Sequence, residues 1–402
     1  MSLHAAVSAP QKLIFVPDSL KSYDFNDDNA RWCWRHSSQT QNIVYFWEKP
    51  FGDNPQNPPS LEGQPMAFDL GNLQIQVERF YHFFRDTLKF SLPGSICDKY
   101  KMMVMVNYSL EGTAYGGTYD DFIGALWVTP NRIQDKKLNC LAHELGHSFQ
   151  LQIMADKTGE AWGGSGFFEM TSQWMLWRVN PDWITDEKYH FDAFRQLTHK
   201  GYLHLDNIYH SPYVIEWWAE KHGLESIAQL YREGKEGEDP VVTYKRKYNM
   251  SQKQFNDEMF DCYRHLVNFD FDYARKSTRP YACTFDTKML KQKNGWLSPD
   301  TALVPENYGF NAIKLDVPQA GRKVEVEFRG KANGYRYGLV GVTADSDECI
   351  YSSMGEATKG KVSFVAPKSQ QLKALYLVVM GAPADHSFDP SSRKFPYEVR
   401  IK

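Results

Sequence analysis

Residues 138–152 constrain the fold and the chemistry of this chain more than any other stretch. They contain His143-Glu144-Leu145-Gly146-His147, in which two histidines stand four positions apart. On an α-helix of about 3.6 residues per turn, such positions share a face, so both imidazoles can reach one metal ion. Glu144 lies beside them, close enough to act on a water bound to that metal. The stretch therefore predicts a helix that carries metal ligands.

The apolar residues of the same stretch also favour a helix. At about 100° per residue, one narrow stripe collects Leu138, Leu141, Leu145 and Phe149, with the histidines roughly opposite. Such a helix can bury its leucine side while its histidine side faces a cleft. A chance match is the alternative, because average residue usage gives this motif in about one chain in a hundred of this length. A third ligand would separate the two interpretations.

Two sources of a third ligand are known for this motif. The extended form needs glycine at 150 and histidine at 153, and this chain has Gln150 and Ile153. The other source is a glutamate on the next helix, and Glu169 follows the glycine-rich run 163–166. Its neighbours 167, 168, 170 and 174 are apolar, and a carboxylate buried among them needs a metal or a basic partner. The metal is the favoured alternative, with an arginine or lysine partner as the other.

These four residues carry a resemblance to a known family. His143, Glu144, His147 and Glu169 resemble the site of the gluzincin zinc metallopeptidases, the group of thermolysin and the M1-type aminopeptidases. The run Gly166-Phe-Phe-Glu169 is also similar to the G-x-x-E of the mucin-targeting M60-like enzymes. The whole chain more loosely resembles uncharacterised secreted zincin-like proteins of gut-type bacteria. The resemblance implies that His143, His147 and Glu169 bind Zn²⁺ and that Glu144 is the general base.

The function that the resemblance implies is zinc-dependent hydrolysis of peptide bonds in proteins, peptides or glycoproteins, with a metal-bound water activated by Glu144. In gluzincins a downstream tyrosine or histidine stabilises the oxyanion. His210 and Tyr213 are the candidates here, with Tyr202 and Tyr209 behind them. Helix packing or capping is the alternative role for all four.

A second function of another class is a catalytically inactive glycan- or surface-binding protein on a peptidase scaffold. Aromatic residues make up 15% of the chain, and they can stack on sugars as well as fill a core. The C-terminal domain is the expected place for glycan binding. Glycan binding that survives loss of zinc, without cleavage of any protein, would favour this function.

Composition excludes several other classes. The chain of 402 residues has 46 basic and 49 acidic residues, so there is no basic excess to indicate nucleic-acid binding. Its six cysteines form no C-x-x-C pair, so neither a cysteine zinc site nor a disulfide framework is predicted. No apolar run reaches about 18 residues, which predicts no transmembrane helix. The first residues lack the pattern of a signal peptide. We expect a secreted, periplasmic or cell-surface protein whose signal peptide is absent from this chain.

The N-terminal third reads as strands and one long helix. Strands are expected at 42–49, 101–107 and 124–129, and an amphipathic helix at 68–90. Gly116-Gly117 is expected to be a turn. In a zincin an edge strand lies along the cleft, and we expect Ala125–Val128 to be that strand.

The sequence after the motif helix predicts helices first and then strands. Helices are expected at 187–197, 213–222, 224–233 and from the capping box at Ser251 to about 267; strands are expected at 324–328, 361–364, 375–380 and 397–401. The predicted fold class is α+β, a zincin-like catalytic domain with a mixed sheet and a helical subdomain, followed by a C-terminal β-sandwich. The predicted catalytic domain covers residues 1–275, of which residues 1–135 are strand-rich and residues 136–275 helical. A linker over 276–299 and a sandwich over 300–402 follow it.

Overall fold

The computed structural model describes residues 11–159, 162 and 166–402. Residues 163–165 of the glycine-rich run 163–166 lie outside these ranges. The chain forms two compact units: unit 1 comprises Met1–Ala161, Arg178–Asn180 and Ile227–Glu233, and unit 2 comprises Trp162–Trp177, Pro181–Ser226 and Gly234–Lys402. The predicted catalytic domain over 1–275 is shared between these units, because most of its helical half packs with the C-terminal strands in unit 2. The mixture of helices and sheets confirms the α+β class.

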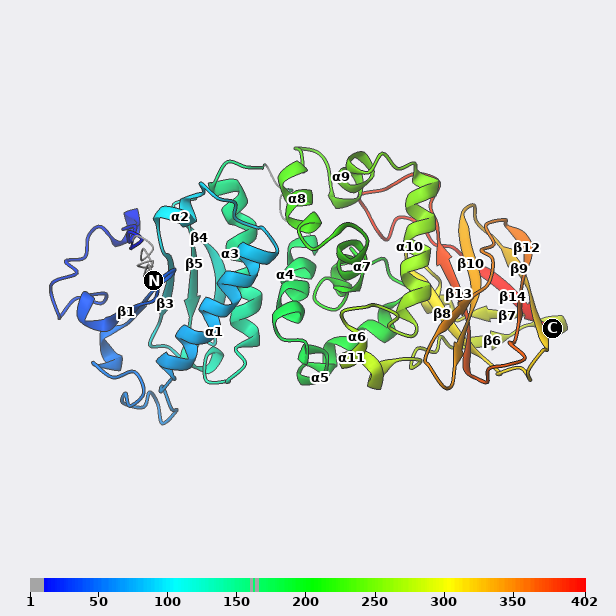
Figure 1. Cartoon of the computed structure of the whole chain (residues 1–402), viewed down its shortest axis with the longest axis horizontal. Coiled ribbons are helices and arrows are strands. Elements are labelled where there is room, and N and C mark those ends of the chain that lie inside the picture. Colours follow the sequence, from blue (N-terminus) through cyan, green and yellow to red (C-terminus); the bar gives the residue numbers. More distant parts are fainter. Residues whose placement is uncertain (1–10, 160–161, 163–165) are drawn as a thin grey trace, which may run out of the picture. The chain divides into compact units, whose positions relative to one another are not determined.

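Unit 1 is built on a five-stranded sheet with the order β1-β2-β3-β5-β4 (Figure 1). The strands are β1 Ser37–Gln39, β2 Ile43–Trp47, β3 Met102–Val106, β4 Ala114–Tyr119 and β5 Ile123–Val128. β2, β3 and β5 are parallel to one another, while β1 and β4 run antiparallel at the two edges. β2 and β3 are fully buried, which explains their continuous apolar sequence.

The edge strand is β4, and two predictions about it are wrong. Ala125–Val128 belongs to β5, which lies inside the sheet between β3 and β4. Gly116 and Gly117 form no turn but pair with Leu126 and Ala125 within the β4–β5 ladder. Packing requires a glycine at position 116, because a Cβ there would lie 1.7 Å from the carbonyl oxygen of Glu144. Propensity alone cannot reveal such a contact between distant segments.

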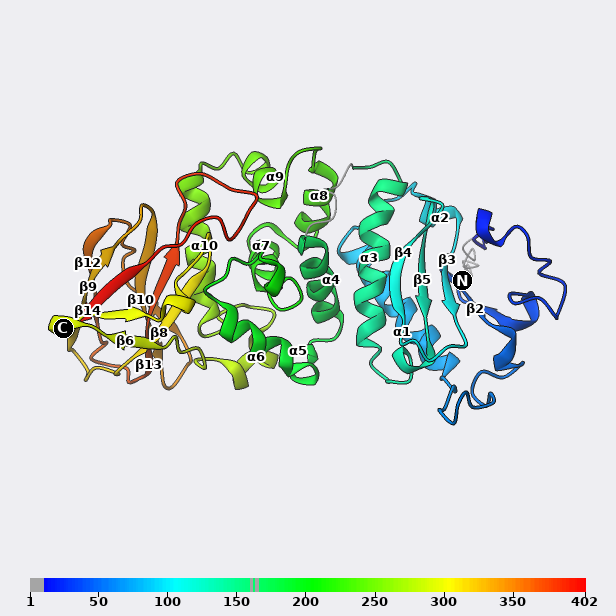
Figure 2. The ribbon, with the colours of Figure 1, turned by 180° about the vertical axis from the view of Figure 1, so that it is seen from behind.

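Helices cover one face of this sheet. The helices of unit 1 are α1 Leu70–His82, α2 Ile96–Lys99, α3 Asn139–Ala155 and all but the first residue of α8 Ser226–Glu233. Asp69 caps α1 by accepting from the Asn72 N–H, and a π-helical turn extends this helix to Thr87. α1 and α3 lie side by side on the sheet, with α3 over β4 and β5 (Figures 1 and 2). The predicted helices at 68–90 and 138–152 are thus confirmed.

The helices of unit 2 form a layer on one side of its strands. They are α4 Gly166–Val179, which ends in unit 1, α5 Trp183–Asp186, α6 Lys188–Leu197, α7 Tyr213–His222, α9 Pro240–Lys247, α10 Gln252–Leu266 and α11 Arg275–Thr278. The capping box at Ser251 and Gln254 is present as predicted. Lys245, Arg246 and Lys247 form the last turn of α9, where basic side chains favour a helix C-terminus. No described helix is long and apolar enough to cross a membrane.

The C-terminal strands form two sheets that face each other across one apolar core (Figure 1). One sheet has the order β11-β10-β13-β8 and the other β12-β9-β14-β7-β6. Their bounds are β6 Met289–Lys291, β7 Leu297–Pro299, β8 Phe310–Leu315, β9 Lys323–Gly330, β10 Tyr335–Thr343, β11 Cys349–Tyr351, β12 Lys359–Val365, β13 Leu372–Gly381 and β14 Tyr397–Ile401. This is the predicted β-sandwich. The predicted linker is wrong, because residues 289–299 supply β6 and β7 to the second sheet.

Candidate metal centre

Helix α3 is held on the sheet by polar side chains on its buried side. The Ser148 hydroxyl donates to the Ala125 carbonyl at 2.8 Å, and the Gly124 N–H donates to Gln152 Oε1 at 2.9 Å. The helix starts at a turn in which the Asp135 carboxylate accepts from the N–H groups of Lys137 and Leu138. Leu141, Leu145 and Phe149 are buried, as their spacing predicted. These contacts fix the rotation of α3 and therefore the direction of its histidines.

The two motif histidines meet at their Nε2 atoms, which lie 3.1 Å apart. Two nitrogens bound to one tetrahedral zinc at about 2.0–2.1 Å would be separated by about 3.3 Å. The observed distance fits that separation. It also fits a hydrogen bond between the rings, so further ligand atoms are needed to favour a metal.

Gln150 orients His147 and was not singled out as functional by the sequence. His147 Nδ1 lies 3.1 Å from Gln150 Oε1, an oxygen that can only accept. The proton of His147 is therefore on Nδ1, which leaves the Nε2 lone pair for a metal. Gln150 is fully buried and cannot easily turn away. Metal-binding histidines usually have such a partner on their second nitrogen.

Glu144 is held by the edge strand. The Gly116 N–H donates to Glu144 Oε2 at 2.8 Å, because β4 turns this amide away from its ladder with β5. The close approach of α3 to β4 at Gly116 makes this bond possible. The carboxylate of Glu144 is thus positioned one residue from His143, on a partly exposed side of the helix.

His143, His147 and Glu169 form a group whose ligand atoms all lie within 4.8 Å of one another. Among the residues that the structure describes, no other group of three or more histidine, cysteine, aspartate or glutamate side chains could hold a metal ion. Two imidazole nitrogens and one carboxylate oxygen are a donor set that suits zinc and leaves a fourth position open. These residues therefore fit the ion that the sequence predicted.

Within unit 2, the loop over 208–210 lies alongside the turn of α4 that carries Glu169. A Cβ on Gly166 would lie 2.1 Å from the Ile208 side chain, so the loop touches the first turn of α4. Gln173, one turn after Glu169, donates to the Tyr209 carbonyl at 3.0 Å. Residues 208–210 therefore run beside Glu169. Tyr209 is 42% exposed, so its ring is accessible from this loop.

His210 belongs to a chain of hydrogen bonds that starts at Gln173. Because Gln173 Nε2 donates to a carbonyl, it is an NH₂ group, and its 3.3 Å contact with His190 Nε2 makes that ring nitrogen the acceptor. His190 then donates from Nδ1 to His210 Nδ1 at 2.7 Å. His210 is left with its proton on Nε2. Burial, and secondarily His190, lowers the pKa of His210 to about 4, so the ring is a neutral donor at pH 7.

Tyr213 and Tyr202 do not belong to this group. Tyr213 is buried against Trp177, Phe194 and Phe269, and burial raises its pKa. Its hydroxyl and that of Tyr202 have no hydrogen-bond partner among the described residues, and both residues line one very small internal cavity. A side chain enclosed in this way cannot reach a substrate. The candidate role of Tyr213 is therefore dropped, and helix packing, its alternative, describes it.

The comparison with protein families covers nearly the whole chain. Residues 6–402 match a family described as a family of unknown function, DUF6055. The chain belongs to the DUF6055 family. No curated protein matches the sequence.

Similar solved structures resemble this DUF6055 protein only weakly. They include the CBM22-1 and GH10 modules of a Clostridium thermocellum endo-1,4-β-D-xylanase with xylohexaose, at 14% identity over 29% of this chain and 24% of that one, with a TM-score of 0.19. The pre-peptidase C-terminal domain of a Bacillus anthracis collagenase is 13% identical over 29% of this chain and 85% of that one, with a TM-score of 0.16. A family GH115 4-O-methyl-α-glucuronidase is 9% identical over 66% of this chain and 40% of that one, with a TM-score of 0.15. Scores this low carry no argument about fold or function.

Proposed function

We propose that this protein is a zinc-dependent peptidase in which His143, His147 and Glu169 hold the metal. The observation that carries the proposal is the 3.1 Å separation of the two Nε2 atoms, with the carboxylate of Glu169 in the same group. Zinc bound there would supply a Lewis acid that polarises a carbonyl group and makes water acidic at neutral pH.

Glu144 is the proposed general base. Its Oε2 is held by the Gly116 N–H, which keeps the carboxylate from rotating freely beside the histidines. Glu144 would take a proton from the water that attacks the scissile carbonyl and pass it to the leaving amine nitrogen. Proton transfer of this kind contributes about 10²–10⁴-fold to the rate.

His210 is the proposed donor to the oxyanion. Its Nε2–H is set by the hydrogen bonds from Gln173 through His190, and its low pKa keeps it neutral across the physiological range. A neutral N–H donor that is already oriented stabilises developing negative charge without reorganisation. Tyr209, on the same exposed loop, is the other side chain available for this role.

Metal content and turnover test the proposal together. Elemental analysis should give about one zinc per chain for the wild type and for a control, Glu111→Ala, which alters an exposed carboxylate. Glu169→Ala should lose most of the zinc, since it removes one of three ligands. Glu144→Gln should keep the zinc and lose at least about 100-fold of the cleavage of casein or of a mixed glycoprotein substrate.

Two results would end the proposal. A wild type that holds no zinc even after incubation with the ion would show that the histidine pair is only a hydrogen bond. Full cleavage by Glu144→Gln would show that another group activates the water. Glycan binding that survives loss of zinc, with no cleavage of any protein, would favour the alternative of an inactive surface-binding protein.

A further inference from the structure

Two cysteines far apart in the sequence contact the same side chain in unit 2. Cys283 follows a short 3₁₀ turn, and Cys349 begins β11 of the sandwich. The Cys283 thiol donates to Asn268 Oδ1 at 3.3 Å, and Asn268 Nδ2 contacts Cys349 Sγ at 3.4 Å. These two atoms belong to the same side-chain amide, so both sulfurs lie next to the Asn268 side chain.

The backbone around each cysteine is fixed. The Cys283 N–H donates to the Val267 carbonyl at 2.9 Å, and the Tyr376 hydroxyl of β13 donates to the Cys283 carbonyl at 2.6 Å. Cys283 is therefore held both by the end of α10 and by the sandwich. Both thiols lie beside Asn268, where the helices and the sandwich of unit 2 join.

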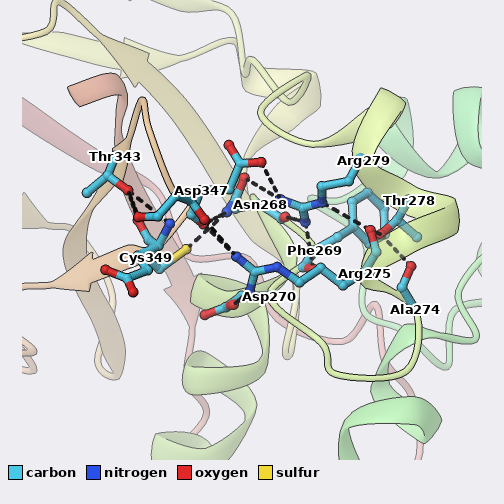
Figure 3. A network of polar contacts seen from close by, with 12 residues as sticks. Asn268, Phe269, Asp270, Ala274, Arg275, Thr278, Arg279, Thr343, Asp347 and Cys349 are labelled. Carbon is cyan, nitrogen blue, oxygen red and sulfur yellow. Dashed lines mark hydrogen bonds and ion pairs between the residues drawn. The ribbon is translucent and has the colours of Figure 1, made fainter. Parts of the chain in front are cut away.

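Polar contacts hold the segment before Cys349 in the same way. Asn268 Nδ2 also donates to the Asp347 carbonyl at 2.9 Å, and Arg275 reaches that carbonyl at 3.0 Å (Figure 3). Arg279 donates to the carbonyls of Asn268 and Phe269 from the other side. This network keeps Asn268 and Cys349 together while the sequence between them forms most of the sandwich.

Exposure separates these two cysteines from most of the others. Cys33, Cys97 and Cys262 are buried, whereas Cys283, Cys349 and Cys140 are partly exposed. Both members of the pair therefore keep partial contact with solvent in the folded protein.

We propose that Cys283 and Cys349 form a reversible disulfide that joins the helical layer of unit 2 to its sandwich. The oxidant is a small-molecule disulfide such as oxidised glutathione. One cysteine thiolate attacks a sulfur of that disulfide, so a mixed disulfide forms and one thiolate leaves. The second cysteine thiolate attacks the protein sulfur and displaces the other. Two protein thiols are oxidised, the external disulfide is reduced to two thiols, and the Asn268 amide swings aside.

The surroundings of the thiols predict how the exchange depends on pH. Burial raises the pKa of the Cys283 thiol and raises that of Cys349 to about 11. Few thiolates exist at neutral pH, so oxidation should speed up as the pH rises from about 7 to about 9. Once formed, the bridge would restrict the unfolded chain between residues 283 and 349 and raise the melting temperature by about 5 °C.

Peptide mapping after oxidation tests the bridge. The reduced full-length protein, freed of reductant, is incubated with oxidised glutathione at a pH of about 8.5, near the ordinary thiol pKa, then quenched with acid, alkylated and digested for mass spectrometry. The expected product is a peptide pair that links Cys283 to Cys349, with a higher melting temperature that dithiothreitol reverses. Cys283→Ser and Cys349→Ser should each abolish the link and the temperature rise, while the control Cys140→Ser keeps both.

Two outcomes would overturn the proposal. One is the recovery of Cys283 and Cys349 as two separate glutathione adducts, which would show that the sulfurs cannot meet. The other is their recovery as free thiols after prolonged oxidation of the wild type. Neither result depends on zinc or on peptidase activity, so the disulfide is tested independently of the proposed function.

Discussion

At the scale of single residues, two glutamines decide where imidazole protons lie. Gln150 accepts from His147 Nδ1, and Gln173 donates to His190, which in turn donates to His210. Each glutamine is almost fully buried, so each has one stable arrangement. The histidines could be suspected from the sequence, but their tautomers follow only from these amides.

Gln150 should govern metal affinity. Gln150→Leu removes the acceptor for the His147 Nδ1–H, and we expect a loss of about 10–100-fold in zinc affinity, measured by competition with a chelating dye. The matched variant Gln150→Glu keeps an acceptor at the same place and should retain the affinity or raise it. Equal affinities for the leucine variant and the wild type would show that Gln150 does not orient the ligand.

His210 and Tyr213 should behave differently although both were candidates. His210→Ala should lower kcat about 100-fold by removing an oxyanion donor. Tyr213→Phe removes a buried hydroxyl that has no partner within the part of the chain that the structure describes, so kcat should not change and the melting temperature should stay the same or rise. Steady-state kinetics and thermal melts of both variants check this, and a large loss of kcat in Tyr213→Phe would restore that residue as a candidate.

At the scale of elements, the proposed site depends on a close approach between a strand and a helix. β4 and α3 approach each other at Gly116, where no side chain separates the strand from the Glu144 backbone. The same approach lets the strand amide bind the Glu144 carboxylate. The position of the general base therefore depends on the absence of a side chain on the edge strand.

Gly116→Ala should damage both stability and catalysis. The added Cβ meets backbone atoms that cannot turn away, so we expect about 2–3 kcal/mol of destabilisation and reduced turnover. Gly71→Ala in α1 is the control, since its Cβ meets only Asp69 Oδ1 at 3.4 Å and alanine favours a helix. Denaturant unfolding of both variants gives the comparison. Similar stabilities would mean that β4 and α3 can separate without cost.

The elements differ in how far the sequence predicts them, for a physical reason. The helix over 139–155 carries its signal locally, in the spacing of its leucines and histidines, and the capping box at Ser251 is equally local. Gly116 is a glycine because of a helix 28 residues later in the chain, as its bond to Glu144 shows. The local sequence pattern, a pair of glycines, predicted a turn at this position instead. The two histidines were predicted from the same local spacing as the helix, and Glu169 from its place on the following helix after a glycine-rich run. Gln150 and Gln173 act through contacts that no local spacing predicts.

At the scale of the whole molecule, the sandwich is integral to unit 2 rather than an attached module. Tyr263 of α10 stacks on Phe310 of β8 with ring centres 4.2 Å apart, and its hydroxyl donates to the Tyr308 carbonyl. Asn256 of the same helix donates to the Pro383 carbonyl at 2.8 Å. The sheet that contains β10 and β13 is accordingly buried on both faces. The match of one family across residues 6–402 agrees with this unity.

Removing the sandwich should therefore destroy the fold of the helices. A chain that ends at residue 299 should be insoluble or rapidly digested by trypsin, because it exposes the apolar face of α10. Phe310→Ala tests the same junction in the full chain and should cost about 3–5 kcal/mol, whereas Phe388→Ala, at a residue 66% exposed, should cost little. A stable, active chain ending at 299 would show that the junction is dispensable.

The hydrogen bond between His190 and His210 has a spectroscopic consequence. A proton held between two imidazole nitrogens 2.7 Å apart, and largely screened from water, exchanges slowly with solvent. Such a proton gives a separate signal far downfield in a nuclear magnetic resonance spectrum. Its presence would report whether this side of the proposed site is intact in any variant, before a substrate is known.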